Sequence, residues 1–160
     1  MPLLDEALNL IQPHATALLE RKSGDVDSIV SLLSSKKLLG RVIVQSFDWA
    51  FLRAFHERVP EQPLAALGPL AGLPGARKVP SAFGQLTGRW LKAMRKTGAQ
   101  IVVWNKKVSN PAVRLAHQQG LKVWIYTIDH PDLAEHLLDM GVDGLITNNP
   151  ALIWKTMAGS

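Results

Sequence analysis

The sequence predicts an α/β protein in which parallel strands alternate with helices, and two observations carry this prediction. LKVWIYTID at 121–129 and GVDGLITNNP at 141–150 are strand patterns separated by a helix pattern, as in a parallel βαβ unit. The same rhythm extends back through the chain, giving about six β/α units in all. Because no shift in composition interrupts it, we expect a single domain over residues 1–160.

The first half of the chain alternates short helix and strand patterns. Helices are predicted where apolar residues recur at helical spacing beside acidic residues that suit a helix N-terminus, or where such spacing directly follows a strand. Strands are predicted where apolar and β-branched residues run together and end in polar ones. On these grounds we expect helices over 3–10, 25–33 and 49–58, and strands over 16–22, 41–48 and 63–67.

The second half continues this rhythm after a segment rich in glycine and proline, 69–80, which predicts a long loop. Gly120 suits the C-cap of the helix that precedes it. We expect helices over 84–98 and 111–119 and between the two closing strands, and strands over 100–105 and within 121–129 and 141–150.

Regular alternation of this kind is compatible with a doubly wound sheet or with a (β/α)8 barrel. No glycine-rich phosphate fingerprint follows an early strand, so a dinucleotide-binding domain is not indicated. In both architectures the loops at the C-terminal ends of the strands carry the functional residues. We therefore expect the functional site at those loops.

The composition narrows the class of protein. The chain has no cysteine, which excludes disulfides and thiolate zinc sites and suits a reducing compartment. The N-terminal segment has acidic residues where a secretory signal needs basic ones, and no apolar run approaches the length of a membrane span. We expect a cytoplasmic protein without a transmembrane segment.

A formal charge of +5 favours anionic ligands. The basic residues occur in short pairs such as Lys36-Lys37 and Lys106-Lys107, without an arginine-rich tract or an RNA-binding aromatic signature. This pattern favours solvated surface, so no nucleic-acid partner is expected. A basic nucleic-acid module would rest on the charge alone.

Several segments resemble the glycerophosphodiester phosphodiesterase family. RVIVQSFDWAFL at 41–52, GLKVWIYTID at 120–129 and GVDGLITNNP at 141–150 are similar to successive C-terminal strands of that family. ALLERKSG at 17–24 resembles an earlier strand, whose usual form is a Glu, an apolar residue and a Lys, and PLLDEAL at 2–8 resembles the helix before it. The resemblance implies a TIM-type (β/α)8 barrel that lacks roughly its first two strands.

The resemblance also implies an activity in lipid metabolism. It is the hydrolysis of glycerophosphodiesters to an alcohol and glycerol phosphate, with a divalent metal, Mg or Ca, as cofactor. The family's catalytic centre begins with a His-Arg pair, a Glu-x-Asp and a further His on its first strands, all of which would precede Pro2. The resemblance therefore assigns no catalytic residue in this chain.

Five positions match residues that the family uses at its site. By resemblance Glu20 is a metal ligand, Lys22 contacts the phosphate, and Ser46, Phe47 and Tyr126 line the substrate pocket. Alternation along a strand would place the first two of these on one face. The structural alternative for that pair is an exposed ion pair, and for the Ser-Phe pair a strand end and a core aromatic. Tyrosine stands where the family usually has tryptophan.

Other candidate ligands are better explained as structure. Asp129, His130 and Asp132 lie close together, but an Asp followed by Pro131 is typical of a capped helix start, and we favour that over a metal site. The five histidines are expected to be ordinary surface or helix residues. Asn148 stands where the family commonly has Asp, which removes a charge from the last loop.

Six strands leave two unpaired edges where eight would close a barrel. Three explanations are open: a truncated product, a fragment of a longer reading frame, or a homo-oligomer in which another copy covers the open edges. In each case we expect the isolated chain to dimerise or aggregate. Two functions stay open for the isolated chain. One is the metal-dependent hydrolysis that the resemblance implies, and the other is a non-catalytic remnant or partner-binding fragment of such a barrel.

Overall fold

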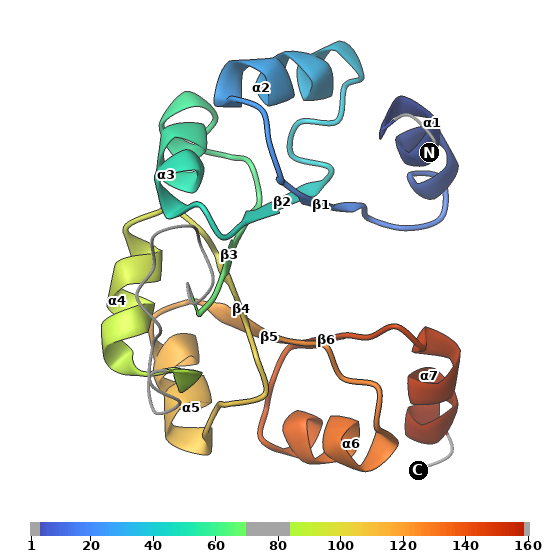
Figure 1. Ribbon diagram of the computed structural model, residues 1–160, viewed down its shortest axis with the longest axis vertical. Coiled ribbons are helices and arrows are strands. Elements are labelled where there is room, and N and C mark those ends of the chain that lie inside the picture. The colour runs from blue at the N-terminus through green and yellow to red at the C-terminus, as the bar shows by residue number, and fades with distance from the viewer. Residues whose placement is uncertain (1–3, 70–83, 159–160) are drawn as a thin grey trace.

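Helices and strands alternate through the part of the chain that the computed structural model describes, residues 4–69 and 84–158 (Figure 1). The described helices are α1 (Leu4–Ile11), α2 (Val26–Ser35), α3 (Trp49–Arg58), α4 (Gly88–Arg95), α5 (Asn110–Gln118), α6 (Pro131–Asp139) and α7 (Pro150–Ala158). The described strands are β1 (Leu18–Glu20), β2 (Ile43–Ser46), β3 (Leu64–Leu67), β4 (Ile101–Trp104), β5 (Lys122–Tyr126) and β6 (Gly144–Ile146). Apart from Pro69, the loop predicted over 69–80 lies outside the described residues.

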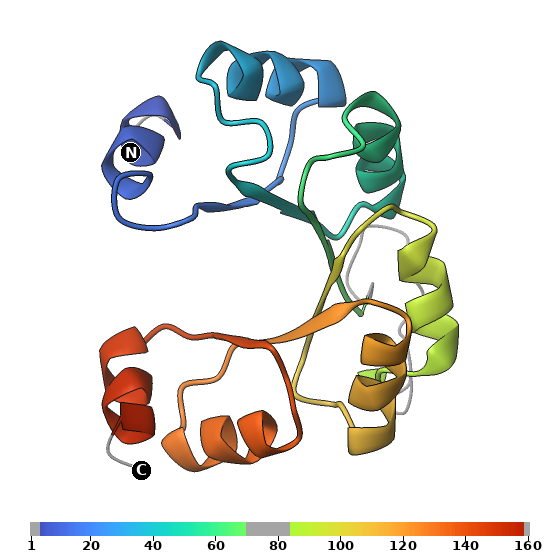
Figure 2. The ribbon, with the colours of Figure 1, turned by 180° about the vertical axis from the view of Figure 1, so that it is seen from behind.

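The six strands form one parallel sheet in which each strand pairs with the next along the chain, in the order β1-β2-β3-β4-β5-β6. The sheet is curved into a C, and the helices lie around its outside (Figures 1 and 2). A doubly wound sheet would carry helices on both faces. The arrangement is therefore that of a partial β/α barrel, which decides between the two architectures that the sequence left open.

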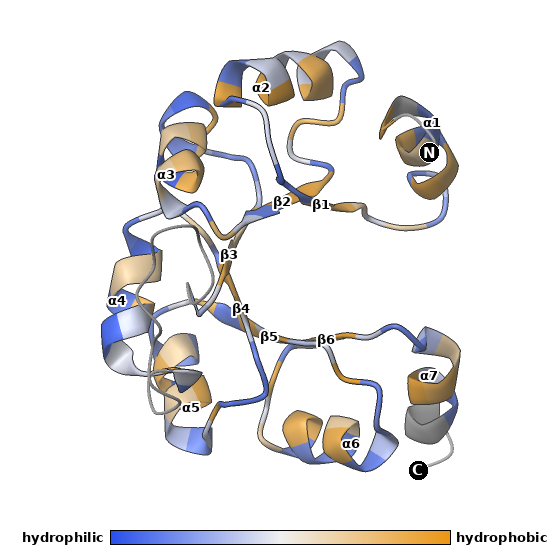
Figure 3. Ribbon diagram, viewed as in Figure 1, coloured by the Kyte–Doolittle hydropathy of each residue, from blue (hydrophilic) through white to orange (hydrophobic). Residues whose placement is uncertain are grey.

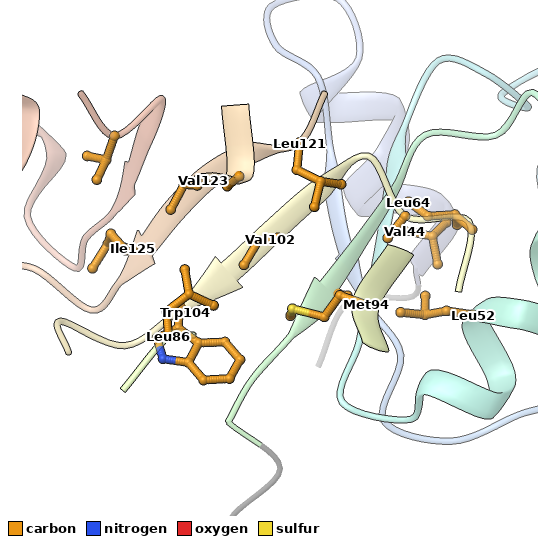
Figure 4. Packing of buried hydrophobic residues seen from close by; sticks show 14 of the residues in the cluster. Val44, Leu52, Leu64, Leu86, Met94, Val102, Trp104, Leu121, Val123 and Ile125 are labelled. Carbon is orange, nitrogen blue, oxygen red and sulfur yellow. The ribbon is translucent and has the colours of Figure 1, made fainter. Parts of the chain in front are cut away.

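The two faces of the sheet carry separate clusters of buried side chains. On the outer face, Val44, Val102 and Trp104 pack with residues of the helices (Figure 4). The alternate positions, among them Leu67 and Val103, form a smaller cluster on the inner face. Apolar residues dominate the strands, whereas the helices carry apolar and polar residues side by side (Figure 3). Strand alternation thus separates the structural core from the wall of the barrel interior.

Local sequence signals explain several helix ends. Asp25 caps α2 by accepting a hydrogen bond from the backbone N–H of Ser28 at 2.8 Å. Asp48 caps α3 through the N–H groups of the second and third residues after it. Gly120, at φ +73, follows the end of α5 and donates its N–H to the carbonyl of His117. The sequence predicted the acidic start of α2 and the glycine after α5, whereas the cap by Asp48 was not predicted.

Four elements differ most from the prediction. Strand β2 covers Ile43–Ser46 instead of 41–48. The first strand is shorter than 16–22, because the chain leaves the sheet after Glu20. Helix α4 begins at Gly88 instead of 84, because Thr87 before it is extended. Helix α7 follows β6 and was not predicted. No helix within 4–69 or 84–158 is both long and apolar enough to cross a membrane.

Candidate active site

The C-terminal ends of the parallel strands meet at one edge of the half-barrel, as they must in a parallel sheet. Glu20 ends β1 and Tyr126 ends β5, and Phe47 directly follows β2. Phe47 and Tyr126 both belong to the inner cluster, and their rings lie 6.4 Å apart at 89°, edge to face. Three of the five site residues expected from the sequence therefore lie at this edge, two of them in direct contact.

Glu20 and Lys22 form an ion pair at the end of β1. The carboxylate side chain is 29% exposed and the lysine side chain 77% exposed. A hollow of about 310 Å³ opens beside them and reaches Leu4 of α1 and Ile29 of α2. This arrangement fits both interpretations of the pair. An exposed ion pair is the purely structural interpretation, and a site for metal and phosphate also requires the two charges to be close together. Their roles toward a ligand stay predictions.

Gln45 is a candidate site residue that sequence reasoning missed. It pairs in register with Glu20, its side chain is buried, and its Oε1 accepts no hydrogen bond from any described group. A buried amide oxygen without a donor is costly unless a ligand or ion completes it. The available signal was a glutamine that directly follows the apolar residues 42–44, inside the strand predicted over 41–48. An oxygen acceptor therefore stands beside the carboxylate of the neighbouring strand.

Tyr126 is fixed at the rim by its hydroxyl group, which donates to the carbonyl of Gly68 at 2.9 Å. Burial of the phenol raises its pKa above the ordinary value, and the negative charge of Glu20 raises it further. The hydroxyl consequently keeps its proton at neutral pH.

Titration of Tyr126 should report this electrostatic contact, because it is the only tyrosine in the chain. We expect its ultraviolet titration midpoint to lie above 10, the usual value for tyrosine. Glu20→Gln should lower the midpoint but leave it above 10, because burial is the larger cause. The exposed Glu57 provides the matched control. Equal shifts in Glu57→Gln and Glu20→Gln would contradict a specific contact.

Ser46 is not brought together with the other predicted site residues. It is 1% exposed, and its Oγ accepts a hydrogen bond from the N–H of Asp48 at 3.0 Å. Its register partner, Ala66, belongs to the outer cluster, so the hydroxyl lies on the helix side of the sheet. The structure therefore gives Ser46 a place in the turn that leads to α3, and its predicted contact with substrate stays untested.

Arg21, which stands where the family usually has an apolar residue, also turns to the outer side. Its guanidinium donates to Asp48 at 2.9 Å and lies 4.7 Å from the ring centroid of Phe51. It also donates to the carbonyl of Gly24. The aromatic contact and the ion pair take the place of apolar packing against α3. The substitution therefore leaves Glu20 at its predicted strand end.

Asp129 does not cap α6, contrary to the expectation from its sequence neighbours. The N-cap of α6 is His130, with Pro131 at the first helical position as predicted. The carboxylate of Asp129 instead accepts hydrogen bonds from Thr147 and from the backbone and side chain of Asn148. The hydrogen-bond donors of the loop after β6 face Asp129 at the same edge of the sheet, so its carboxylate binds them instead of the first N–H groups of α6. Asn148 thus serves to hold two site loops together.

The hydrogen bonds to Asp129 should make the stability of the chain depend on pH. The backbone N–H of Asn148, followed by its side chain, lowers the pKa of Asp129 below its ordinary value. The folded state therefore favours the ionised carboxylate, so this contribution is present above the ordinary pKa of about 3.9 and disappears as the pH falls through the folded value. We expect Asp129→Asn to lower the urea midpoint at pH 7, with the difference shrinking below pH 4.

The comparison that tests this prediction is a pair of urea titrations at pH 7 and pH 3 for wild type and Asp129→Asn. Asp132→Asn is the control, because that residue is acidic, close in sequence and in the first turn of α6. A difference between wild type and Asp129→Asn that stays constant across this pH range would show that the carboxylate is not the group responsible.

The side chains near the end of β1 include oxygen ligands that suit a hard divalent cation, but these ligands are few. Glu20 and Gln45 offer a carboxylate and an unpaired amide oxygen, the ligand types that Mg²⁺ and Ca²⁺ prefer. Within residues 4–69 and 84–158, no three His, Cys, Asp or Glu side chains lie close enough together to hold a metal. The described residues therefore fit part of such a coordination shell.

The curved parallel sheet, with a carboxylate, an ammonium group and an aromatic pair at its strand ends, defines a protein of the β/α-barrel class with its site at the usual edge. The chain belongs to the glycerophosphoryl diester phosphodiesterase family, whose model matches residues 4–152. The family resemblance expected from the sequence is thereby confirmed.

Individual relatives agree with this family. A glycerophosphodiester phosphodiesterase of Bacillus subtilis is 28% identical over 170 residues, which cover 99% of this chain and 55% of the relative. A glycerophosphodiester phosphodiesterase of Arabidopsis thaliana is 23% identical over 166 residues, with 98% and 46% covered. The chain thus spans about half the length of these curated relatives.

Solved structures confirm the fold. A protein assigned as a glycerophosphoryl diester phosphodiesterase from Silicibacter pomeroyi superposes with a TM-score of 0.81 at 25% identity, covering 99% of this chain and 56% of the other. A phosphodiesterase of Oleispira antarctica, solved with the product sn-glycerol-3-phosphate, gives a TM-score of 0.76 at 18% identity, with 98% and 61% covered. The six described strands are therefore part of a TIM-type barrel.

Proposed function

We propose that this chain acts in the metal-dependent hydrolysis of glycerophosphodiesters to an alcohol and glycerol phosphate. Membership of the phosphodiesterase family supports the reaction class. The single observation that carries the proposal is the edge at which Glu20, Lys22, Phe47 and Tyr126 lie at the C-terminal ends of parallel strands. This is the edge at which β/α barrels bind and convert their substrates.

The residues present suggest how the work is divided. Glu20, with Gln45 beside it, would hold one side of a Mg²⁺ or Ca²⁺ ion. A divalent cation at this place would neutralise charge on the phosphoryl oxygens. Lys22 would bind the phosphate as a point charge. Phe47 and Tyr126 would give the glycerol part an apolar wall, and the neutral Tyr126 hydroxyl would orient that wall through Gly68.

The groups that give and take protons are not assigned to any described residue. His117 pairs with Asp143 at 2.8 Å, and His56 and His136 lie in α3 and α6. General acid and base catalysis requires a group within hydrogen-bond reach of the reacting oxygen. We therefore propose that the chain supplies mainly the binding wall and one metal ligand. Turnover would then depend on groups beyond the described set.

The test combines turnover with product binding. The purified chain is incubated with glycerophosphocholine, with Mg²⁺, with Ca²⁺ or with EDTA, and choline release is measured. Binding of sn-glycerol 3-phosphate is measured by calorimetry under the same conditions. Metal-dependent binding, with or without turnover, is the expected result. Absence of both in every metal would contradict the proposal.

A second candidate function is a non-catalytic fragment that contributes packing or a partner-binding surface. The observation that favours it is that the described residues lack the cluster of three His, Cys, Asp or Glu side chains that a complete metal centre would show. Under this alternative, neither the product nor the metal binds, although the chain folds. The experiment above separates the two.

We propose further that a second copy of the chain covers the open side of the half-barrel. Within the described residues, β1 and β6 each pair on one side only. The exposed large apolar side chains lie on the two flanking helices, with Leu10 of α1 75% exposed and Trp154 of α7 71% exposed. Unpaired edges next to exposed apolar side chains favour association.

Sedimentation should show this association. We expect the wild-type chain to exceed its monomer mass of 17.5 kDa, and Leu10→Glu combined with Trp154→Glu to shift the distribution toward monomer. Exposed Glu57→Lys, on the outer helix α3, changes a surface charge away from both edges and serves as the control. A wild-type chain that sediments as a monomer at micromolar concentration would contradict the proposal.

A further inference from the structure

The charge of this chain is strongly segregated along the sequence. Residues 62–128 contain ten lysines and arginines and no aspartate or glutamate. The remainder carries eight basic and thirteen acidic residues. The modest net charge of +5 is therefore the difference between a strongly basic middle segment and acidic ends. Such a field draws anions to the surface that the middle segment forms.

Helices α4 and α5 collect part of this charge around a hollow. Arg95 and Lys96 lie three and four residues after Lys92, which places the three side chains on one side of α4 and its C-cap. Together with Gly88 and with Gln119 at the end of α5, they line a hollow of about 600 Å³. This volume lies within the range of small-molecule sites, about 300–1,000 Å³.

The three cations are not neutralised by the surrounding structure. Their side chains are exposed, and in the stretches 4–69 and 84–158 none of them has a carboxylate partner. Neither α4 nor α5 contains an acidic residue. The negative end of the α4 dipole favours cations in its last turn. The helix dipole does not explain why three cations line one hollow between two helices.

The hollow is distinct from the candidate active site. Helices α4 and α5 lie side by side outside the sheet (Figure 1), and their residues line the hollow. The rings of Phe47 and Tyr126 belong to the inner cluster. Glu20 and Lys22 line a different hollow, beside β1. The two sites therefore share no lining residue, and a ligand at one leaves the other accessible.

We propose that the hollow between α4 and α5 binds a compact phosphate-bearing anion with two or more negative charges. Arg95 can bind phosphate oxygens in a bidentate manner, and Lys92 and Lys96 add point charges. The amide of Gln119 can donate to a further oxygen. No aromatic side chain is among the lining residues, so the stacking platform of a single-stranded nucleic-acid site is missing from this part of the structure.

Calorimetric titration of the full chain with sodium pyrophosphate at low ionic strength tests this site. We expect the triple variant Lys92→Gln, Arg95→Gln, Lys96→Gln to weaken binding at least tenfold. A matched triple variant, Lys37→Gln, Arg41→Gln, Lys155→Gln, removes the same charge from exposed positions outside the basic segment. It should change the affinity less than twofold. Equal losses in both triple variants, or no binding by the wild type, would overturn the proposal.

Three further measurements identify the source of the phosphate, separate a defined site from a diffuse basic surface and guard against misfolding. Vesicles of phosphatidylcholine with and without phosphatidic acid show whether the phosphate can belong to a lipid head group. If only the variant Lys92→Gln, Arg95→Gln, Lys96→Gln loses vesicle binding, the lipid phosphate binds in the hollow between α4 and α5. The second measurement is binding of duplex DNA. If the wild type binds DNA but not pyrophosphate, and both triple variants weaken DNA binding equally, the surface is a diffuse polyanion-binding surface and the proposed site is wrong. Arg95→Gln alone, checked by circular dichroism, should still weaken pyrophosphate binding several-fold.

Discussion

Replacing Glu20 with glutamine should weaken the metal-dependent binding of sn-glycerol 3-phosphate by about a hundredfold or more. Losing an orienting group around a metal costs up to about that factor, and Glu20 is the carboxylate that the proposal gives to the metal itself. The replacement keeps the shape of the side chain and its oxygen but removes the charge. The measurement is calorimetric titration of the product at fixed Mg²⁺ or Ca²⁺, alongside turnover where it occurs.

The ion pair with Lys22 makes this experiment discriminating. Without metal, Glu20→Gln releases Lys22 from its partner, so residual phosphate binding should stay equal or become tighter. With metal present, Glu20→Gln should lose the increase in product affinity that the metal ion gives to the wild type. Glu57→Gln removes an exposed charge from α3 and should behave as the wild type. The same metal dependence in Glu20→Gln and wild type would leave Glu20 as a structural ion pair only.

Gly68→Ala should destabilise the chain by about 1–3 kcal/mol or more, as overpacking of a tight core does. A Cβ on Gly68 would overlap the ring of Trp104, with Cε3 only 2.8 Å away. Trp104 cannot yield easily, because it is fully buried and its indole N–H donates to the carbonyl of Gly84 at 2.9 Å. Its ring also contacts Trp90 at 5.6 Å, and Trp90 contacts Trp49 at 5.7 Å.

The free energy of unfolding in urea, followed by tryptophan fluorescence, measures this effect. Gly84→Ala is the matched control, because its added Cβ would approach the flexible side chain of Lys107, at 3.2 Å from Cδ, and the amide nitrogen of Asn105 at an ordinary 3.7 Å. It should cost far less than Gly68→Ala. Gly68 also accepts the hydrogen bond of Tyr126, so the substitution should disturb the tyrosine titration as well. Equal losses of unfolding free energy for the two substitutions would show that the packed rings of Trp104, Trp90 and Trp49 can move aside at little cost.

Much of the fold was predictable because each unit carries its own local signals. The helix over 49–58 begins and ends at the predicted residues, since Asp48 caps it and a buried strand precedes it. The strand runs QIVVWN and LKVWIYTID were recognised from apolar and β-branched composition alone. The barrel itself could not be chosen from periodicity, because both layouts of parallel strands use the same rhythm.

The candidate site was less predictable, because it depends on which side of a strand each residue faces and on contacts between distant loops. Strand alternation separates Phe47 from Ser46, so a sequence pair that looks like one unit is divided between two faces. Asp129 looked like a helix cap, yet it binds a loop about twenty residues further on. Gln45 was overlooked because a single polar residue in an apolar run does not reveal its missing partner.

The order of the sheet has a consequence for how the chain is made. Every strand pairs with the strand that follows it, as in the pairing of Leu18 with Ile43, so no strand waits for a partner from a remote part of the sequence. Since each unit completes the edge left by the unit before it, the sheet can grow in the order of synthesis. At every stage the newest strand is the edge on which the sheet grows, while the outer edge of β1 stays unpaired among the described strands, and this order suits assembly on the ribosome one β/α unit at a time.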